Sequence, residues 1–221
     1  MKQEITLIND NMFNVELPYA KLILTDVPYG EVSRESQGLR VLDKSHADDI
    51  TFELQDFLNA IYNKADTFVI FCGNEQYSEI YAYFAQKQKE GKGTVRQLIW
   101  AKSNPSPMNA QYILMSSTEN AVWFKKRGTG KLNVPMSKNY IIAPTGSSKY
   151  HPTEKNHKLL AEIIETNTVE GDLVVDPLFG SGSTGIVAKK LGRKFFGVEL
   201  QKQYYDIAKE RLESLWVKLN T

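Results

Sequence analysis

The chain has 221 residues, of which 42% are hydrophobic and 24% charged, and its net charge at pH 7 is only +1. This composition supplies enough apolar surface for a full core and is most simply that of one domain. No apolar run is long enough to cross a bilayer and the first residues lack the apolar stretch of an export signal, so we expect a cytoplasmic protein. The single cysteine, Cys72, excludes an internal disulfide, and the three histidines show no metal-ligand spacing.

Alternating short apolar runs and amphipathic segments predict strands and helices along the whole chain. Strands are predicted over residues 4–8, 21–25, 67–72, 96–100, 121–124, 173–175 and 194–198. Helices are predicted over about 49–64, through 77–84, after 151–155, after 182 and over 201–219, with Thr153 as the N-cap of the third. The polar segment 31–47 is interpreted as a loop that could act as a lid. Residues 125–131 are interpreted as a basic, glycine-containing turn, and the polar run from there to residue 150 is expected to be irregular.

The strand over residues 21–25 leads directly into Asp26-Val27-Pro28-Tyr29. The carboxyl ends of strands are where open α/β sheets bind their ligands. If the substrate were an exocyclic amine, Asp26 would accept one amine hydrogen and the Val27 carbonyl the other, in a direction restricted by Pro28. Tyr29 offers a flat surface on which a flipped base could stack. The alternative is a strand-ending turn with a buried tyrosine.

A glycine-rich turn follows the strand over residues 173–175. Gly180, Gly182 and Gly185 have G-x-G-x-x-G spacing and lead into a helix. Glycine tolerates a positive φ, and its missing Cβ lets backbone N–H groups approach a ligand closely. The pattern therefore indicates a cofactor-binding turn. An ordinary strand–helix–strand crossover, with glycines that serve only packing, is the alternative.

Two acids flank this turn and narrow the choice of cofactor. Glu199 ends the next strand, where a carboxylate can accept the hydroxyl hydrogen bonds of a ribose. Asp176-Pro177 stands at the tip of the preceding strand, where a carboxylate would repel the pyrophosphate of NAD. A carboxylate there suits an ammonium or sulfonium centre, which favours S-adenosylmethionine over NAD.

Positive charge is concentrated in residues 92–158. This segment has eleven lysines or arginines against two acids, Glu119 and Glu154, an excess of nine positive charges. A basic segment of this kind is typical of a surface that binds the phosphates of DNA. A solvated lysine-rich face is the alternative.

Several motifs, in this order, make the chain resemble DNA amino-methyltransferases of the permuted type called β. They are Asn9-Asp10, the tetrad of residues 26–29, residues 100–107 with 118–125, His151-Pro-Thr-Glu-Lys155, Asp176-Pro-Leu-Phe-Gly-Ser-Gly182 and Gly197-Val-Glu-Leu200. The resemblance implies a Rossmann-like S-adenosylmethionine-dependent methyltransferase fold, with a mixed, mostly parallel sheet and helices on both faces. It implies double-stranded DNA as the substrate and a homodimer as an expected assembly. The recognition region would be the short insertion at about 127–150.

The resemblance also assigns roles to individual residues. The catalytic residues would be Asp26, Val27, Pro28 and Tyr29. The cofactor-binding residues would be Asp10, His151, Thr153, Lys155, Asp176, Pro177, Phe179, Gly180, Ser181, Gly182, Thr184, Glu199 and Leu200. The DNA-binding residues would be Arg34, Lys102, Asn104, Lys125, Lys126, Arg127, Lys131 and Lys138.

The chain departs from the family pattern at Val27, Asn156 and Asn9, which replace two prolines and a glycine. In the family that the chain resembles, an aspartate at the start of the tetrad is commoner with adenine and a serine with cytosine, so the resemblance implies adenine N6 over cytosine N4. A non-catalytic DNA-binding protein, an NAD oxidoreductase and a protein or RNA methyltransferase are competing hypotheses. A cytosine C5 enzyme needs a nucleophilic thiolate, and Cys72 lies inside an apolar strand, so we reject that mechanism.

Overall fold

A computed structural model describes residues 4–28, 52–107, 110–145 and 154–220. Its strands are β1 Ile5–Asn9, β2 Ala20–Asp26, β3 Ala65–Cys72, β4 Gly93–Lys102, β5 Thr118–Lys126, β6 Tyr140–Ala143, β7 Leu173–Asp176 and β8 Lys194–Glu199. Its helices are α1 Leu54–Tyr62, α2 Asn74–Lys89, α3 His157–Asn167, α4 Ser183–Lys190 and α5 Lys202–Asn220, with a short 3₁₀ turn at Met12–Asn14. None of the helices in the described ranges is long and apolar enough to cross a membrane.

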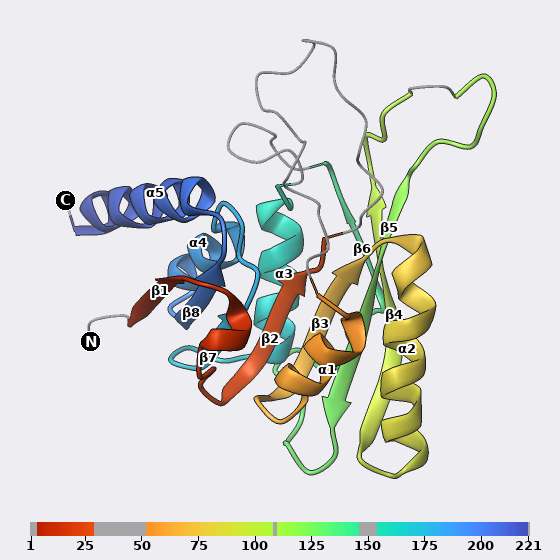
Figure 1. The fold of residues 1–221 in the computed structure, drawn as a ribbon. Helices are drawn as coiled ribbons and strands as arrows, with labels where there is room; N and C mark the ends of the chain where they lie inside the picture. Colours follow the sequence, from red (N-terminus) through yellow and green to blue (C-terminus); the bar gives the residue numbers. More distant parts are fainter. Residues whose placement is uncertain (1–3, 29–51, 108–109, 146–153, 221) are drawn as a thin grey trace.

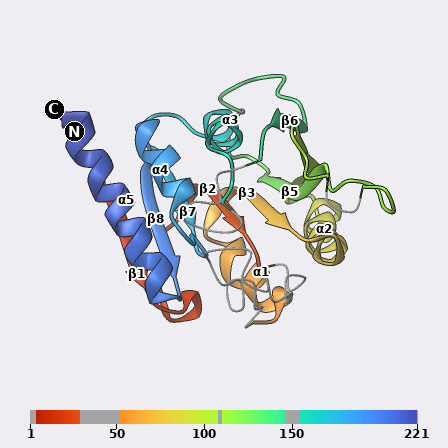
Figure 2. The same ribbon diagram turned by 90° about the horizontal axis from the view of Figure 1, so that it is seen from above.

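Within the described residues the strands form one sheet in the order β1-β8-β7-β2-β3-β5-β4-β6 (Figure 1). Every strand but β5 runs in the same direction, since β5 is antiparallel to both β3 and β4. The helices cover both faces of this sheet (Figure 2). The mixed, mostly parallel sheet and the two helical layers confirm the architecture expected from the sequence.

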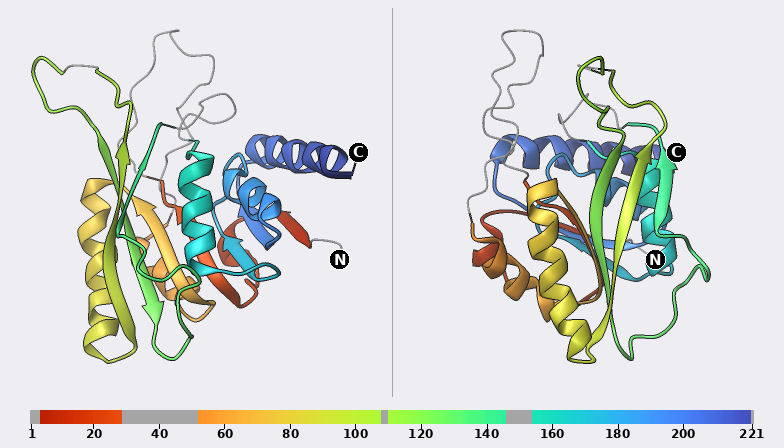
Figure 3. Two further views of the ribbon diagram at one scale, coloured as in Figure 1. Left: turned by 180° about the vertical axis from the view of Figure 1, so that it is seen from behind. Right: turned by 90° about the vertical axis from the view of Figure 1, so that its right-hand side faces the viewer.

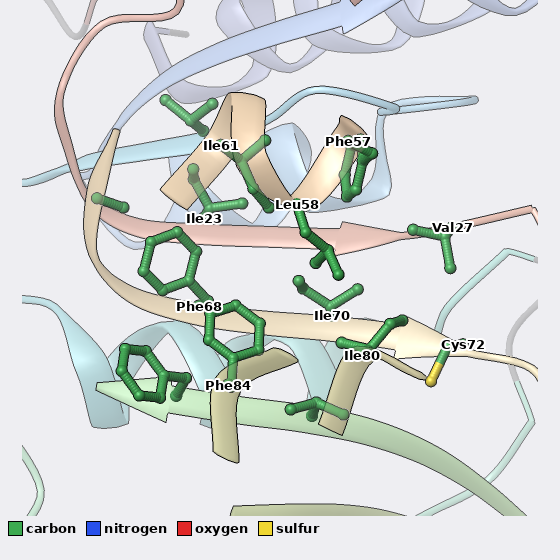
Figure 4. Close-up of a cluster of buried hydrophobic side chains, with 14 of the residues drawn as sticks. Ile23, Val27, Phe57, Leu58, Ile61, Phe68, Ile70, Cys72, Ile80 and Phe84 are labelled. Carbon is green, nitrogen blue, oxygen red and sulfur yellow. The ribbon is translucent and has the colours of Figure 1, made fainter. Parts of the chain in front are cut away.

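Side chains alternate between the two cores along each buried strand, because successive residues of a strand face opposite sides. Ile23 of β2 and Phe68 of β3 pack toward α1 and α2, as the close-up in Figure 4 shows. Leu22 and Val69, their neighbours in sequence, pack into the second cluster beneath α3, α4 and α5. The central strands are thus buried on both faces, which explains why they are continuous apolar runs.

The strand β6 is not predicted by the sequence pattern, and the expectation of an irregular run to residue 150 is wrong at Tyr140–Ala143. This strand pairs with β4 at the edge of the sheet, and the Trp100 Nε1 donates to the Ala143 carbonyl at 2.9 Å. Only Ile141 and Ala143 of this strand are buried. An alternation of buried and exposed residues over only four positions is too short to predict a strand from the sequence.

The start of α3 also differs from the prediction. The helix begins at His157, and its N-cap is Asn156, whose side chain accepts from the Lys158 and Leu159 amides. Thr153 is therefore not the N-cap. Asparagine is among the best N-cap residues, so the position at which the family pattern has proline acquires a capping role here.

Candidate active site

The strand ends bring the predicted acidic residues to one end of the sheet. Glu199, Asp176 and Asp26 are the last residues of β8, β7 and β2, which are adjacent and parallel. Cys72 ends the next strand, β3. We call this end of the sheet the carboxyl end and the opposite one the amino end. The connection between β4 and β5 also extends beyond the carboxyl end (Figure 3).

Asp26, which is partly exposed, forms an ion pair with a buried lysine at this end. Its Oδ2 lies 2.7 Å from the ammonium of Lys155, a side chain that is only 8% exposed. The same ammonium lies 2.8 Å from Glu119, and Glu119 lies 3.0 Å from Lys102. Four charges of alternating sign thus run from β2 to β4. Burial raises the pKa of Glu119, but the two lysines outweigh it and hold that pKa below its ordinary value.

The backbone after Asp26 is held by hydrogen bonds. The Val27 amide donates to the Phe71 carbonyl at 3.0 Å, and the Pro28 carbonyl accepts from the Gln76 Nε2 at 2.6 Å. Gln76 is buried and also accepts from the Gly73 amide. The sequence analysis did not identify Gln76, because a single glutamine in a helix with several aromatic residues belongs to no recognisable motif. Tyr29 lies outside the described residues.

Asp176 is the most perturbed acid of the site. Burial raises its pKa to about 7, while the Thr184 hydroxyl and the Leu178 amide favour the ionised form and the Asp26 charge opposes it. Among the described residues Asp176 forms no ion pair. A ligand with a positive charge beside this carboxyl group would offset the cost of burying it.

Glu199 joins the glycine-rich turn to the end of β8. Its Oε2 accepts from the Gly180 amide at 2.9 Å and its Oε1 from the Gln201 amide at 2.7 Å. Burial still raises its pKa, because these amides offset only part of the desolvation. An ionised carboxylate has about four acceptor sites, so both oxygens keep capacity for hydroxyl hydrogen bonds. The Asn9 Nδ2 donates to the Glu199 carbonyl at 2.8 Å and so supports the same strand end.

Two glycines of the turn serve packing. A Cβ on Gly182, whose φ is +83°, would lie 2.7 Å from the Ala208 Cβ, and a Cβ on Gly185 would lie 2.7 Å from the Phe195 ring. These glycines therefore let α4 approach α5 and β8. Whether their backbone N–H groups also approach a ligand stays a prediction.

Arg211 of α5 clamps the glycine-rich turn, and sequence reasoning missed it. Its guanidinium donates to the Ser181 carbonyl at 2.7 Å and pairs with Glu154, whose side chain is 4% exposed. Glu154 also accepts from the Ser183 hydroxyl at 3.1 Å. In the sequence, an arginine among the charged residues of an amphipathic helix is read as a solvent-exposed residue. Its contact with the turn is seen only in the folded structure.

The other predicted cofactor residues are spread around the turn. Phe179, Ser181 and Thr184 are buried, Pro177 follows Asp176, and Leu200 is exposed. Asp10 is exposed beside Glu199 and accepts from the Asn11 amide and the Asn14 Nδ2. His151 and Thr153 lie outside the described residues. Lys155 contacts Asp26 of β2 and Glu119 of β5, so these ion pairs join it to those two strands and not to the glycine-rich turn.

Cys72 is unsuited to nucleophilic catalysis. Burial, with a smaller contribution from the nearby Asp26 charge, raises the pKa of its thiol to about 12. The thiol stays protonated at neutral pH, and the thiolate is the nucleophilic form. This agrees with the rejection of a cytosine C5 mechanism.

The predicted DNA-binding residues do not share one surface. Lys125 and Lys126 end β5, and Arg127 and Lys131 follow it, at the amino end of the sheet and away from Asp26. Lys125 donates to Thr129, and Lys126 stands over the Tyr62 ring.

The remaining members of that set have partners within the protein or are not described. Lys102 pairs with Glu119, and Asn104 accepts from the Thr145 amide at 2.7 Å. Lys138 is exposed and donates to the Tyr140 hydroxyl. Arg34 lies outside the described residues. A basic segment in the sequence is therefore not a single basic face in the fold.

The arrangement fits a nucleoside cofactor with a cationic centre. Glu199 keeps acceptor sites for a ribose, and Asp176 is a buried carboxyl group without an ion-pair partner in the described ranges. Asp26 stands on the next strand, where it can receive a substrate. The carboxyl groups suited to a cofactor and to an acceptor molecule thus stand at the ends of neighbouring strands.

Comparisons with known proteins agree with this geometry. A family model described as DNA methylase matches residues 20–210. Type II methyltransferase M2.DpnII of Streptococcus pneumoniae is 35% identical over 152 residues, which are 61% of this chain and 57% of the relative. Type II methyltransferase M2.LlaDCHI of Lactococcus lactis subsp. cremoris is 35% identical over 150 residues, 60% of this chain and 56% of the relative. The matches thus span less than two thirds of these relatives.

A solved structure extends the likeness to nearly the whole chain. The crystal structure of the M1.HpyAVI–SAM complex has a TM-score of 0.72 and 26% identity, and the match covers 94% of this chain and 100% of that one. PvuII DNA methyltransferase, described as cytosine-N4-specific, has a TM-score of 0.69 over 94% of this chain and 86% of its own, but at 18% identity it shows the fold alone. The Rossmann-like methyltransferase fold is confirmed. Since the family model covers both the Asp26 and the Asp176 strand ends, the chain belongs to the DNA methylase family.

Proposed function

We propose that this chain is a site-specific DNA adenine-N6 methyltransferase, which transfers a methyl group from S-adenosylmethionine to an adenine turned out of the duplex. The observation that carries the proposal is the position of the Asp26 carboxylate. It ends β2, the strand next to β7 of the predicted cofactor site, and it is paired with the Lys155 ammonium. The names of similar proteins, Type II methyltransferases and a SAM complex, support the reaction class.

The cofactor would be held by residues at the ends of two strands. Glu199 would accept from the ribose hydroxyls, and Asp176 would face the positive charge of the amino-acid part. The Gly180–Gly182 turn, clamped by Arg211, would form the wall between them. When bound, S-adenosylmethionine supplies an electrophilic methyl group on a sulfonium centre.

Asp26 and Val27 would activate the substrate amine. The lone pair of an adenine N6 amine is delocalised into the ring, which makes the amine a poor nucleophile. Hydrogen bonds from its two protons to Asp26 and to the Val27 carbonyl would shift that lone pair toward nitrogen. Positioning and electrostatics then provide most of the acceleration, with no covalent enzyme intermediate. Replacement of the family's proline by Val27 keeps the carbonyl, and the Val27 amide and Pro28 carbonyl are held by hydrogen bonds.

Adenine is proposed because the tetrad begins with aspartate, and cytosine N4 is the alternative with the same mechanism. A homodimer and a cytoplasmic location stay predictions. The recognition role of residues 127–150 is also a prediction, since Tyr140–Ala143 belongs to the sheet. The deciding experiment incubates the protein with labelled S-adenosylmethionine and mixed-sequence duplex DNA, digests the DNA to nucleosides and identifies the product by mass.

N6-methyladenine is the expected product. N4-methylcytosine would correct the base and keep the mechanism. Cofactor binding without any methylated nucleoside would contradict the enzyme and favour the non-catalytic DNA-binding alternative, for which Val27→Pro is the next variant to assay.

A further inference from the structure

We propose that Lys155 is a positioning residue for methyl transfer, which holds Asp26 through its Oδ2 in the ionised state that accepts the substrate amine. The inference rests on the proposed function and deepens it, because it assigns a residue of the His-Pro-Thr-Glu-Lys segment to the substrate half of the site. The family resemblance places Lys155 with the cofactor instead.

The geometry of Lys155 leaves little freedom for its ammonium. The group lies 2.7 Å from Asp26 and 2.8 Å from Glu119, and it stands 5.0 Å from the centre of the Phe71 ring. The side chain is only 8% exposed. A lysine held between two carboxylates on different strands keeps each of them in a defined place, because a buried ion pair loses much of its stabilisation when it is distorted.

The charges around Asp26 make a cation necessary. Among the described residues, the carboxyl groups near it are those of Asp176 on β7 and of Glu119 on β5, which shares the Lys155 ammonium. The Cys72 thiol lies on β3, and Lys102 approaches Glu119 from β4. Without Lys155, two neighbouring carboxyl groups would favour protonation of Asp26. A protonated Asp26 is a poorer acceptor for an amine hydrogen. Burial and the Asp26 charge already keep the pKa of Asp176 at about 7.

Consecutive side chains of the segment serve different halves of the site. Glu154 contacts Arg211 and the Ser183 hydroxyl beside the glycine-rich turn, whereas Lys155 contacts Asp26. The backbone between them therefore ties the two half-sites together. This division allows a test in which each half is disturbed separately.

The test compares Lys155→Met, Lys155→Gln, Lys155→Arg and Arg211→Met with the unaltered protein. The first readout is the titration of the Asp26 carboxyl carbon by NMR of aspartate-labelled protein without DNA, with Asp26→Asn used for assignment. The second is single-turnover methyl transfer between pH 5 and 9 at saturating cofactor and DNA. The third is the cofactor Kd from calorimetry. Lys158→Met, an exposed lysine of α3, is the matched control.

In Lys155→Met and Lys155→Gln we expect the Asp26 midpoint and the acid limb of the rate profile to rise by about one pH unit or more. The rate constant should fall on the order of 100-fold, as expected when a reacting group is misplaced. Lys155→Arg should restore most of the Asp26 midpoint and most of the rate constant. Lys158→Met should match the unaltered protein in both quantities. Arg211→Met should weaken cofactor binding and leave the Asp26 midpoint in place.

An unchanged Asp26 midpoint in both Lys155→Met and Lys155→Gln would overturn the inference. So would weaker cofactor binding with the rate constant at saturation preserved, which is the behaviour of a cofactor residue. If the unaltered protein methylates no DNA, the proposed function fails. The NMR titration then still decides whether Lys155 controls the charge of Asp26.

Discussion

At the scale of single residues, the three acids at the strand ends are in different electrostatic states. Asp26 is paired with a lysine, Asp176 is buried with a pKa of about 7, and Glu199 accepts two backbone amides. In the proposed mechanism the same residue type would therefore offer an acceptor for an amine, a counter-charge for a cation and a hydrogen-bond acceptor for hydroxyls. Environment assigns these roles, because burial and neighbouring charges decide whether a carboxyl group is ionised.

Asp26→Asn should remove methyl transfer while it leaves cofactor binding intact. The amide keeps the shape of the side chain and an oxygen for Lys155 but is a much weaker acceptor for the substrate amine. We expect the rate to fall by about 100-fold to 10,000-fold and the cofactor Kd to change by less than about 3-fold. Single-turnover assays and calorimetry measure the two quantities. Turnover close to that of the unaltered protein would refute the role of Asp26.

Asp176→Asn should stabilise the ligand-free protein at alkaline pH. The folded-state pKa is raised from 3.8 to about 7, so folding disfavours ionisation of this group. Its contribution to stability is fully present below about pH 4 and is lost as pH rises through 7. Removal of the titrating group should raise the free energy of unfolding at pH 8 by at most about 4 kcal/mol. This limit is the rise in pKa from 3.8 to about 7 multiplied by about 1.4 kcal/mol per pKa unit.

Urea unfolding at pH 4 and pH 8 checks this sign. The two proteins should agree at pH 4 and differ at pH 8, and the asparagine variant should bind the cationic cofactor more weakly. A variant that is less stable than the unaltered protein at pH 8 would contradict the raised pKa.

At the scale of the elements, three consecutive residues connect the site to the start of α3. Glu154 contacts Arg211 of α5, Lys155 contacts Asp26 of β2, and Asn156 caps the helix. Because the Asn156 cap fixes where α3 begins, it also fixes the backbone position of Glu154 and Lys155 just before the helix, from which their side chains reach Arg211 and Asp26. The short turn after β7 is held in a similar way by Glu199 of β8 and by α5.

Asn156→Ala should cost about 1 kcal/mol of stability, because two amides of the first helical turn lose their side-chain acceptor. Asn156→Ser should recover most of the loss, since a serine hydroxyl also caps well. Thermal unfolding of the three proteins gives the comparison. Equal stability of the alanine variant and the unaltered protein would mean that the cap contributes nothing.

At the scale of the whole molecule, the fold separates charges that are close in sequence. Lys102 and Lys155 are used in ion pairs at the carboxyl end of the sheet, whereas Lys125, Lys126 and Arg127 lie at its amino end. The antiparallel direction of β5 causes this separation, because that strand carries the chain away from Asp26. In the proposed reaction, a DNA duplex that delivers a base to Asp26 would approach the carboxyl end.

The double variant Arg127→Ala, Lys131→Ala should therefore leave DNA binding nearly unchanged. We expect a change in Kd of less than about 2-fold and the same dependence of log Kd on log salt, since each lost phosphate contact would lower that slope by about 0.9. Fluorescence anisotropy at several salt concentrations makes the measurement. A slope reduced by one to two units would place DNA contacts at the amino end after all.

Sequence patterns alone specify the strands other than β6 in chain order, the three acidic strand ends and the glycine-rich turn, because strand hydrophobicity and turn chemistry are local properties. They also place Asp26, Asp176 and Glu199 at strand ends, and parallel pairing then brings them together. Their separate ionisation states follow from burial and neighbouring charges, which come from distant segments.

Only the tertiary structure decides the contacts made across long sequence separations. Lys155 reaches Asp26 and Glu119, Arg211 reaches Ser181, and the four-residue strand β6 completes the edge of the sheet. Gly182 packs against Ala208. Such contacts join residues with no common local pattern, and their free energy comes from desolvated charges and close packing that exist only after the chain has folded.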